Sequence, residues 1–319
     1  MAAKEQRASN LIWIFGDQHR AQALGLAGDA NVSTPNIDAL AAEGVTFERA
    51  VSGSPLCCPY RGSLLSGRYP HKAVPGHQMQ LSPDLFTIAQ PFKAAGYSTA
   101  WFGKWHVDGF QEREGRAACH QIPRERRGGF DTWIGYENNN AQYDAWVHGH
   151  RGAEEVELQR LAGYETDALT DVLIEHIRGQ AQGDTPFFAS LSVQPPHDPY
   201  VAPPEAMGRH SPGRIELRAN VPPVARIVER ARRELAGYYA MIENLDVNLG
   251  RVVSALREEG LYDDTHIVFF SDHGDMHGSH GQFRKTAPWE ESIRVPCVVG
   301  GGRRYEMKSG TRSDAPINH

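Results

Sequence analysis

The sequence predicts an α/β fold with a mostly parallel central sheet that helices cover on both faces. Two observations support this prediction. Short apolar runs bounded by turn residues recur along the chain, as buried strands do, and helical patterns lie between them. This alternation favours parallel pairing, because each helix returns the chain to the same end of the sheet. The expected strands are Leu11–Phe15, Thr99–Phe102, Phe187–Val193, His266–Ser271 and Val295–Val299.

Three helices are indicated by their boundary residues. Thr34 and Pro35 suit the start of a helix, and a glycine suits the position after its last residue. The expected helices follow Thr34 up to Gly44, cover Asp84–Ala95 before Gly96, and cover Glu229–Glu259 before Gly260. The segment 107–163 is rich in Gly, Arg and Asn and only weakly periodic, so we expect a long surface excursion that borders a site. With no repeat or low-complexity linker, we expect one catalytic domain over residues 1–319.

Composition excludes some classes of function. The 319 residues are 40% hydrophobic and 23% charged, as in ordinary globular proteins. The formal net charge of -6 argues against a nucleic-acid surface, which needs a basic face. Small anionic substrates stay possible, because a local cluster of cations can override a mildly negative total.

The beginning of the chain and its cysteines suggest a compartment. The apolar stretch from Leu11 to Gly16 is too short for a signal-peptide core or a membrane span. We therefore expect a cytoplasmic protein without a membrane partner. The cysteines are Cys57, Cys58, Cys119 and Cys297, without a C-x-x-C pair. Adjacent cysteines suit disulfide geometry poorly, so we expect reduced or chemically modified thiols.

Polar side chains follow four of the five predicted strands directly. In open α/β sheets, ligands bind beyond the carboxyl ends of the strands. A single polar set of this kind is more often an ordinary turn, but four at one edge indicate a site. The sets are Gly16-Asp17-Gln18-His19, Gly103-Lys104-Trp105-His106, Pro195-Pro196-His197-Asp198 and Asp272-His273-Gly274-Asp275.

Three of these residues form a candidate metal site. Asp17, Asp272 and His273 supply two carboxylates and an imidazole, a mixture that suits a divalent cation and leaves room for a substrate oxygen. Gln18 can add a carbonyl oxygen. His277 and His280 are rival ligands that follow the strand by several residues, so we expect them at the surface or behind the ligands.

The segment from Leu56 to Arg68, LCCPYRGSLLSGR, is the most specific signal. Pro59 suits the first turn of a helix, which places Cys57 at the positive N-terminal end, where a nucleophile or an anion is stabilised. Arg61 can reach the same place with a planar set of donors. A thiol phosphatase loop needs Cys-x5-Arg, and neither cysteine has that spacing.

Cys57-Cys58-Pro59-Tyr60-Arg61 resembles the C-x-P-x-R signature of the type I, formylglycine-dependent sulfatases, which belong to the alkaline phosphatase-like superfamily. The resemblance covers nearly the whole chain. It extends to Asp17, to Gly103-Lys104-Trp105-His106, to Pro195-Pro196-His197, to Ser271-Asp272-His273-Gly274, and to Lys285 with Glu290-Glu291-Ser292-Ile293-Arg294-Val295-Pro296.

The resemblance implies a reaction. A maturation enzyme would oxidise Cys57 to formylglycine (3-oxoalanine), whose hydrate attacks a sulfate ester. One divalent cation would be held by Asp17, Gln18, residue 57, Asp272 and His273. Arg61, Lys104 and Lys285 would hold the sulfate and the hydrate. His197 would donate to the leaving oxygen, and His106 would act as the base that expels sulfate. For Lys285 the sequence leaves Arg284 as an alternative.

Two departures from the family pattern affect these expectations. Many relatives carry paired acids after the first strand, whereas this chain has Asp17 and then Gln18; Ca²⁺ is favoured, with Mn²⁺ or Zn²⁺ as alternatives. The chain also stops at His319, where relatives continue into a small C-terminal subdomain, so it is expected to be truncated relative to the family. The alternative functions are a phosphonate monoester or phosphodiester hydrolase on the same scaffold, and a truncated non-catalytic metal-binding protein. The particular small-molecule or saccharide sulfate ester and the oligomeric state stay open.

Overall fold

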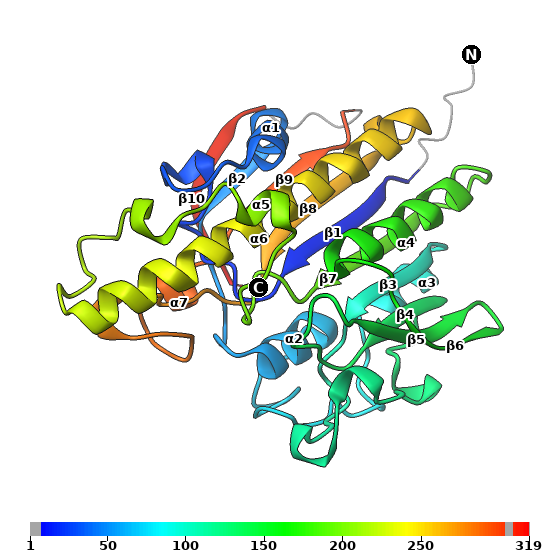
Figure 1. The fold of residues 1–319 in the computed structure, drawn as a ribbon. Helices are drawn as coiled ribbons and strands as arrows, with labels where there is room; N and C mark the ends of the chain where they lie inside the picture. Colours follow the sequence, from blue (N-terminus) through cyan, green and yellow to red (C-terminus); the bar gives the residue numbers. More distant parts are fainter. Residues whose placement is uncertain (1–7, 304–308, 319) are drawn as a thin grey trace.

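A large mixed sheet runs through the middle of the protein (Figure 1). The computed structural model describes residues 8–303 and 309–318, and within them the sheet has ten strands in the order β10-β2-β9-β8-β1-β7-β3-β4-β5-β6. The strands are β1 (Asn10–Gly16), β2 (Val45–Val51), β3 (Ser98–Lys104), β4 (Thr132–Tyr136), β5 (Trp146–Arg151), β6 (Glu154–Arg160), β7 (Phe187–Val193), β8 (Thr265–Ser271), β9 (Cys297–Gly301) and β10 (Thr311–Asn318).

The centre of the sheet is parallel. Strands β8, β1, β7, β3 and β4 pair in parallel in that order, and β10 is parallel to β2. Strand β9 is antiparallel to β8 and β2, and β5 and β6 form an antiparallel edge. The predicted α/β fold with a mostly parallel sheet is therefore confirmed, and the carboxyl ends of β1, β3, β7 and β8 meet at one edge.

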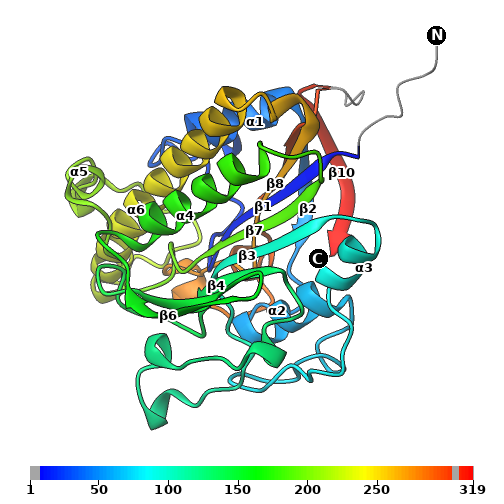
Figure 2. The ribbon, with the colours of Figure 1, turned by 90° about the vertical axis from the view of Figure 1, so that its right-hand side faces the viewer.

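Helices cover both faces of the sheet, as predicted. The side view shows α1, α4 and α6 on one face and α2 and α3 on the other (Figure 2). The helices are α1 (Pro35–Glu43), α2 (Cys57–Ser66), α3 (Ala89–Ala94), α4 (Glu165–Gln180), α5 (Pro204–Met207), α6 (Ala225–Glu258) and α7 (Glu290–Ile293). Among the described residues, no helix is both long and apolar enough to cross a bilayer.

The two faces bury different side chains. Alternate residues of a strand point to opposite faces, so in β1 the side chains of Ile12 and Ile14 pack into an aliphatic core that includes α1, α4 and α6. Trp13 and Phe15 pack into an aromatic core that contains Trp101, together with residues of α2. Helix α2, which begins at Cys57, is therefore held against rigid rings.

Most predicted elements are present, with three differences. The fifth predicted strand begins at Cys297 rather than Val295, and it is antiparallel. The helix predicted from Asp84 begins only at Ala89, because the residues before it form a turn in which Leu85 N–H donates to the carbonyl of Ser82. The helix predicted from Glu229 already begins at Ala225.

Part of the segment 107–163 differs from the surface excursion that we expected. Its β4, β5 and β6 extend the sheet, and Trp133 and Tyr136 are fully buried. Glycine hides the strand pattern here: a Cβ on Gly149 would lie 1.7 Å from the carbonyl oxygen of Trp133, so this close approach of two strands needs a residue without a side chain.

Candidate active site

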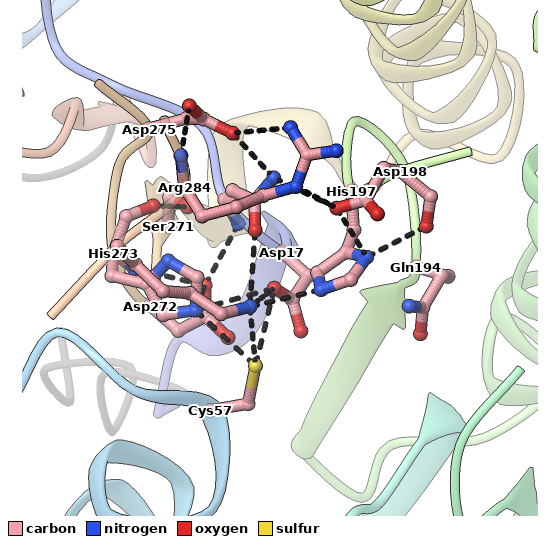
Figure 3. Close-up of polar contacts among 12 residues, drawn as sticks. Asp17, Cys57, Gln194, His197, Asp198, Ser271, Asp272, His273, Asp275 and Arg284 are labelled. Atoms are coloured by element: carbon pink, nitrogen blue, oxygen red, sulfur yellow. Dashed lines mark hydrogen bonds and ion pairs between the residues drawn. The ribbon is translucent and has the colours of Figure 1, made fainter. Parts of the chain in front are cut away.

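The predicted residues converge where the parallel strands end (Figure 3). Asp17 and Gln18 follow β1, Lys104 ends β3, His197 lies four residues after β7, and Asp272 and His273 follow β8. The parallel pairing of β1 with β7 and β8 brings these ends together. Figure 3 shows the Cys57 sulfur pointing from α2 toward Asp17, Asp272 and His273.

Asp17 lies at the centre of the site and is fully buried. Its Oδ2 accepts from Lys104 Nζ at 2.6 Å and from Arg61 at 3.4 Å. Its Oδ1 lies 3.4 Å from His273 Nε2 and 3.9 Å from Lys285 Nζ. Burial raises the pKa of Asp17, but Lys104 and Lys285 outweigh burial and hold the pKa well below its ordinary value. Asp17 is therefore a carboxylate.

Cys57 begins α2, as predicted. Its Sγ lies 3.5 Å from Asp17 Oδ1, 3.2 Å from His273 Nε2 and 3.1 Å from Lys285 Nζ. Burial and Asp17 raise the pKa of the Cys57 thiol, whereas Lys285, Lys104 and His273 lower it, and the net direction is downward. All four cysteines are free of disulfide bonds in the structure; the expectation that they are reduced or chemically modified stays a prediction.

Asp272 and His273 are held by backbone contacts. Asp272 Oδ1 accepts from the backbone N–H groups of Gln18 at 3.0 Å and His273 at 2.8 Å. His273 Nδ1 lies 3.1 Å from the carbonyl oxygen of Gly274, which leaves Nε2 directed at Cys57. Burial lowers the pKa of His273, but Asp272 outweighs it and the pKa is raised.

These residues form a possible metal site. One ligand atom from each of Asp17, Cys57, Asp272 and His273 lies within 4.8 Å of the others, and all four residues are buried. Within the part of the chain that the structure describes, Asp272 Oδ2 is buried without a hydrogen-bond partner, although it lies 3.4 Å from Arg61. A buried carboxylate oxygen of this kind is a natural cation ligand. The residues therefore fit one divalent cation.

Gln18 contacts the site through its carbonyl oxygen. Its Oε1 accepts from Lys285 Nζ at 3.0 Å, while its Nε2 donates to Asp275 Oδ2 at 2.7 Å and to Tyr200 Oη at 3.2 Å. Because acceptors surround Nε2, the amide is fixed with its oxygen toward the cations. The backbone of Gln18 has a φ of +74°, which is rare for a residue with a side chain.

Three positively charged side chains surround Asp17 and Cys57, namely Arg61, Lys104 and Lys285. Arg61 donates to Ser192 Oγ at 2.7 Å and to the carbonyl oxygen of Lys104 at 3.0 Å, so its guanidinium is fixed between the two buried carboxylates. Lys285 contacts Cys57, whereas Arg284 forms ion pairs with Glu234 at 2.8 Å and Asp198 at 3.2 Å. Of the two neighbours left open by the sequence, Lys285 is therefore the one that lies in the site.

Two histidines differ in how they join the site. His197 Nε2 lies 2.8 Å from Lys285 Nζ, and its Nδ1 lies 2.7 Å from the carbonyl oxygen of Asp198. His106 is buried, but among the described residues neither of its ring nitrogens has a hydrogen-bond partner. Burial and a neighbouring lysine hold the pKa of each histidine well below its ordinary value. Both are neutral and can accept a proton.

Some residues around the site were not assigned by sequence reasoning. Asp275 and Ser192 fix Gln18 and Arg61, and Tyr200 Oη donates to Asp275 Oδ2 at 2.7 Å. The place of Asp275 directly after a predicted strand was the only signal in the sequence. His277 is buried rather than at the surface, behind the ligands, and His280 is exposed.

Comparison with known proteins agrees with this geometry. The sequence pattern of the family described as Sulfatase matches residues 9–319. The chain is 38% identical to an ulvan-active sulfatase of Formosa agariphila, over 98% of this chain and 60% of that protein. It is 32% identical to an arylsulfatase of Clostridium perfringens, over 91% of this chain and 68% of that protein.

Solved structures agree as well. A Bacteroides fragilis structure described as a candidate sulfatase, yidJ, superposes with a TM-score of 0.89 at 28% identity and covers 100% of this chain and 73% of that one. The chain spans about 60 to 65% of the length of the first curated relatives that it matches.

Proposed function

The chain belongs to the sulfatase family, and from this premise we propose that it is a sulfuric ester hydrolase, which converts a sulfate ester to an alcohol and inorganic sulfate. One observation carries the proposal: the Cys57 sulfur lies at the N-terminal end of α2, within 3.5 Å of Asp17, His273 and Lys285. Any oxygen nucleophile made from residue 57 would therefore lie beside the ammonium group of Lys285 and at the positive end of the α2 dipole.

The proposed roles follow from the contacts. Arg61, Lys104 and Lys285 bind the sulfate oxygens and stabilise the negative charge that grows on them in the transition state. Because Arg61 and Lys104 are fully buried, their charges act in a poorly solvated place where they are strongest. The negative charge of a bound sulfate ester raises the proton affinity of His197, which takes up a proton and then donates it to the leaving oxygen. Lys285, 2.8 Å away, keeps its ring in place.

A divalent cation and a modified Cys57 complete the proposed site. Asp17, Gln18, residue 57, Asp272 and His273 hold the cation, with Ca²⁺ favoured by the oxygen ligands. When bound, the cation supplies Lewis acidity and lowers the pKa of a coordinated hydroxyl. We propose that a maturation enzyme oxidises Cys57 to formylglycine. His106, neutral and without a hydrogen-bond partner among residues 8–303 and 309–318, accepts the proton that is released when sulfate leaves.

We propose a saccharide sulfate as the substrate class. The support comes from the relatives: an ulvan-active sulfatase, an endo-4-O-sulfatase and an N-acetylglucosamine-6-O-sulfatase align with 93% or more of this chain. The cytoplasmic location expected from the sequence stays a prediction, as do the oligomeric state and the absence of nucleic-acid and membrane partners.

A substrate panel tests the reaction. The matured full chain is expected to hydrolyse sulfated saccharides and an aryl sulfate faster than phosphodiesters and phosphonate monoesters. A phosphonate monoester hydrolase of Agrobacterium radiobacter shares the fold, with a TM-score of 0.71 at 24% identity. Faster turnover of a phosphorus ester would therefore reverse the proposal in favour of that chemistry.

Intact-mass analysis tests maturation. Protein from the native host is expected to show the mass decrease that accompanies exchange of the Cys57 thiol for an aldehyde, and a Cys57→Ser variant is not. A native chain that carries unmodified Cys57 and hydrolyses no ester would support the non-catalytic, metal-binding alternative.

A further inference from the structure

A second group of metal-ligand side chains lies outside the cluster around Asp17. We propose that Cys58, His77 and His106 form a binding site for a soft or borderline divalent cation, with Zn²⁺ as the chemical type. The site uses Cys58, a buried cysteine that the proposed reaction does not need. It combines one thiol with two imidazoles, a ligand set that selects zinc over the calcium expected among oxygen ligands.

The spacing of the three side chains fits one ion. The Cys58 sulfur and one ring nitrogen from each histidine lie within 4.8 Å of one another. Cys58 Sγ lies 3.5 Å from His77 Nδ1, and a sulfur and a nitrogen on a tetrahedral zinc ion are about 3.5 Å apart. The two imidazole rings meet edge to face, with centroids 5.3 Å apart.

His106 supplies an independent sign of a ligand. Its side chain is 2% exposed, and within the described residues both ring nitrogens lack a hydrogen-bond partner. A buried polar group without a partner costs about 1–3 kcal/mol, which ligation would offset. The backbone of His106 has a φ of +57°, and such strain in a non-glycine residue is often retained at functional positions.

Cys58 is already oriented for ligation. The backbone N–H of Gln78 donates to its Sγ at 3.3 Å, and hydrogen bonds of this kind orient and tune a metal ligand. His77, which precedes Gln78 in the sequence, is exposed, and this gives a cation a path from solvent. On binding, Cys58 would lose its thiol proton to solvent while both imidazoles bind in the neutral form.

Zinc at this site would inhibit the enzyme. This part rests on the proposed function, because ligation occupies the nitrogen lone pair with which His106 would accept a proton. Binding itself needs no turnover, so the two can be tested separately.

Cobalt spectroscopy tests the binding. The full chain with Cys57→Ser is used, so that the Asp17 cluster offers no thiolate, and excess Ca²⁺ occupies that cluster. Added Co²⁺ is expected to produce a thiolate-to-cobalt charge-transfer band that equimolar Zn²⁺ removes. The band is expected to vanish in Cys57→Ser/Cys58→Ser and in Cys57→Ser/His77→Ala. It is expected to persist in Cys57→Ser/Cys119→Ser, which removes a partly exposed thiol instead.

Metal binding at Cys58, His77 and His106 and the inhibition of hydrolysis are contradicted by different results. Absence of the band in Cys57→Ser, or its survival after loss of either Cys58 or His77, would overturn the site. Because His77 is exposed, its truncation keeps the core intact and the result stays interpretable. In the matured wild-type chain, hydrolysis of a sulfate ester is expected to fall as the site fills with Zn²⁺, and unchanged turnover at full occupancy would overturn the inhibition.

Discussion

Cys57 and Cys58 are both buried and are joined by one peptide bond, but their thiols lie in opposite surroundings. Successive residues of a helix point about 100° apart. The Cys57 sulfur therefore reaches Asp17 and Lys285, whereas Cys58 belongs to the aromatic core and contacts His77. The pKa of Cys57 is lowered overall, and burial raises the pKa of Cys58. Because both thiols are buried, the difference in their pKa values comes from the side chains that each thiol faces and not from the extent of burial.

The largest expected effect comes from removing the reactive thiol. Cys57→Ala should reduce kcat/KM for a sulfate ester by about 10⁴-fold or more, since the nucleophile can no longer be made. Cys297→Ala is the matched control, because it also removes a buried thiol but lies in β9. Steady-state kinetics on both variants provides the measurement, and similar losses in the two would contradict the special place of Cys57.

The second effect is on stability. Arg61 lies 3.4 Å from both Asp17 and Asp272. Asp17 keeps its ion pair with Lys104 at 2.6 Å, but Arg61→Met leaves the buried carboxylate of Asp272 without its arginine. We expect the free energy of unfolding in the presence of a chelator to fall by about 3–5 kcal/mol, measured by urea denaturation. Lys93→Met breaks an exposed pair with Asp131 and should cost less than about 1 kcal/mol. Equal losses would show that burial is not what matters around Cys57.

A third effect concerns the dependence of stability on pH, at a buried histidine away from the two cysteines. His148 is buried in β5 and accepts from the N–H of Ile122 at 2.7 Å. Burial and Arg127 lower its pKa to about 4. The unfolded chain therefore binds the proton first as the pH falls from about 6.5, and up to about 3 kcal/mol of stability is lost by about pH 4.

His148→Gln keeps an acceptor and does not titrate. It should make the stability of the chain less dependent on pH in this range, as measured by urea denaturation at several pH values. An unchanged pH dependence would contradict the assignment.

The smallest expected effect concerns the orientation of Gln18. Asp275 Oδ2 accepts from Gln18 Nε2. Asp275→Asn replaces one oxygen of this carboxylate, an acceptor, with an amide nitrogen, which is a donor. Gln18 would then turn its carbonyl oxygen away from the site, and we expect the affinity for Ca²⁺ to fall about tenfold. Thermal melting at increasing Ca²⁺ concentration measures this. Asp198→Asn, whose contact with Gln18 is longer at 3.4 Å, should have a smaller effect.

The sequence predicted the site better than it predicted the edges of the sheet. Residues such as Lys104 and Asp272 follow apolar runs directly, and parallel strands must bring those ends together. Strand β5 carries histidine, glycine and arginine, and the apolar residues of β6 are limited to Val156 and Leu158, so neither strand has the apolar run by which the other strands were predicted. Helix α4 and strands β2 and β10 were not predicted either. Partnerships such as Gln18 with Asp275 join residues 257 positions apart, and no local pattern predicts them.

The place of β8 beside β1 has a consequence for protein synthesis. Asp272 fixes the backbone of Gln18 across 254 positions, and Lys285 comes later still. While the ribosome is still making the middle of the chain, the nascent protein carries Asp17 and Cys57 without the residues that complete the cation site. A cation at the proposed site can therefore assist only the last stage of folding, after β8 has been inserted into the sheet, and it cannot guide the early stages.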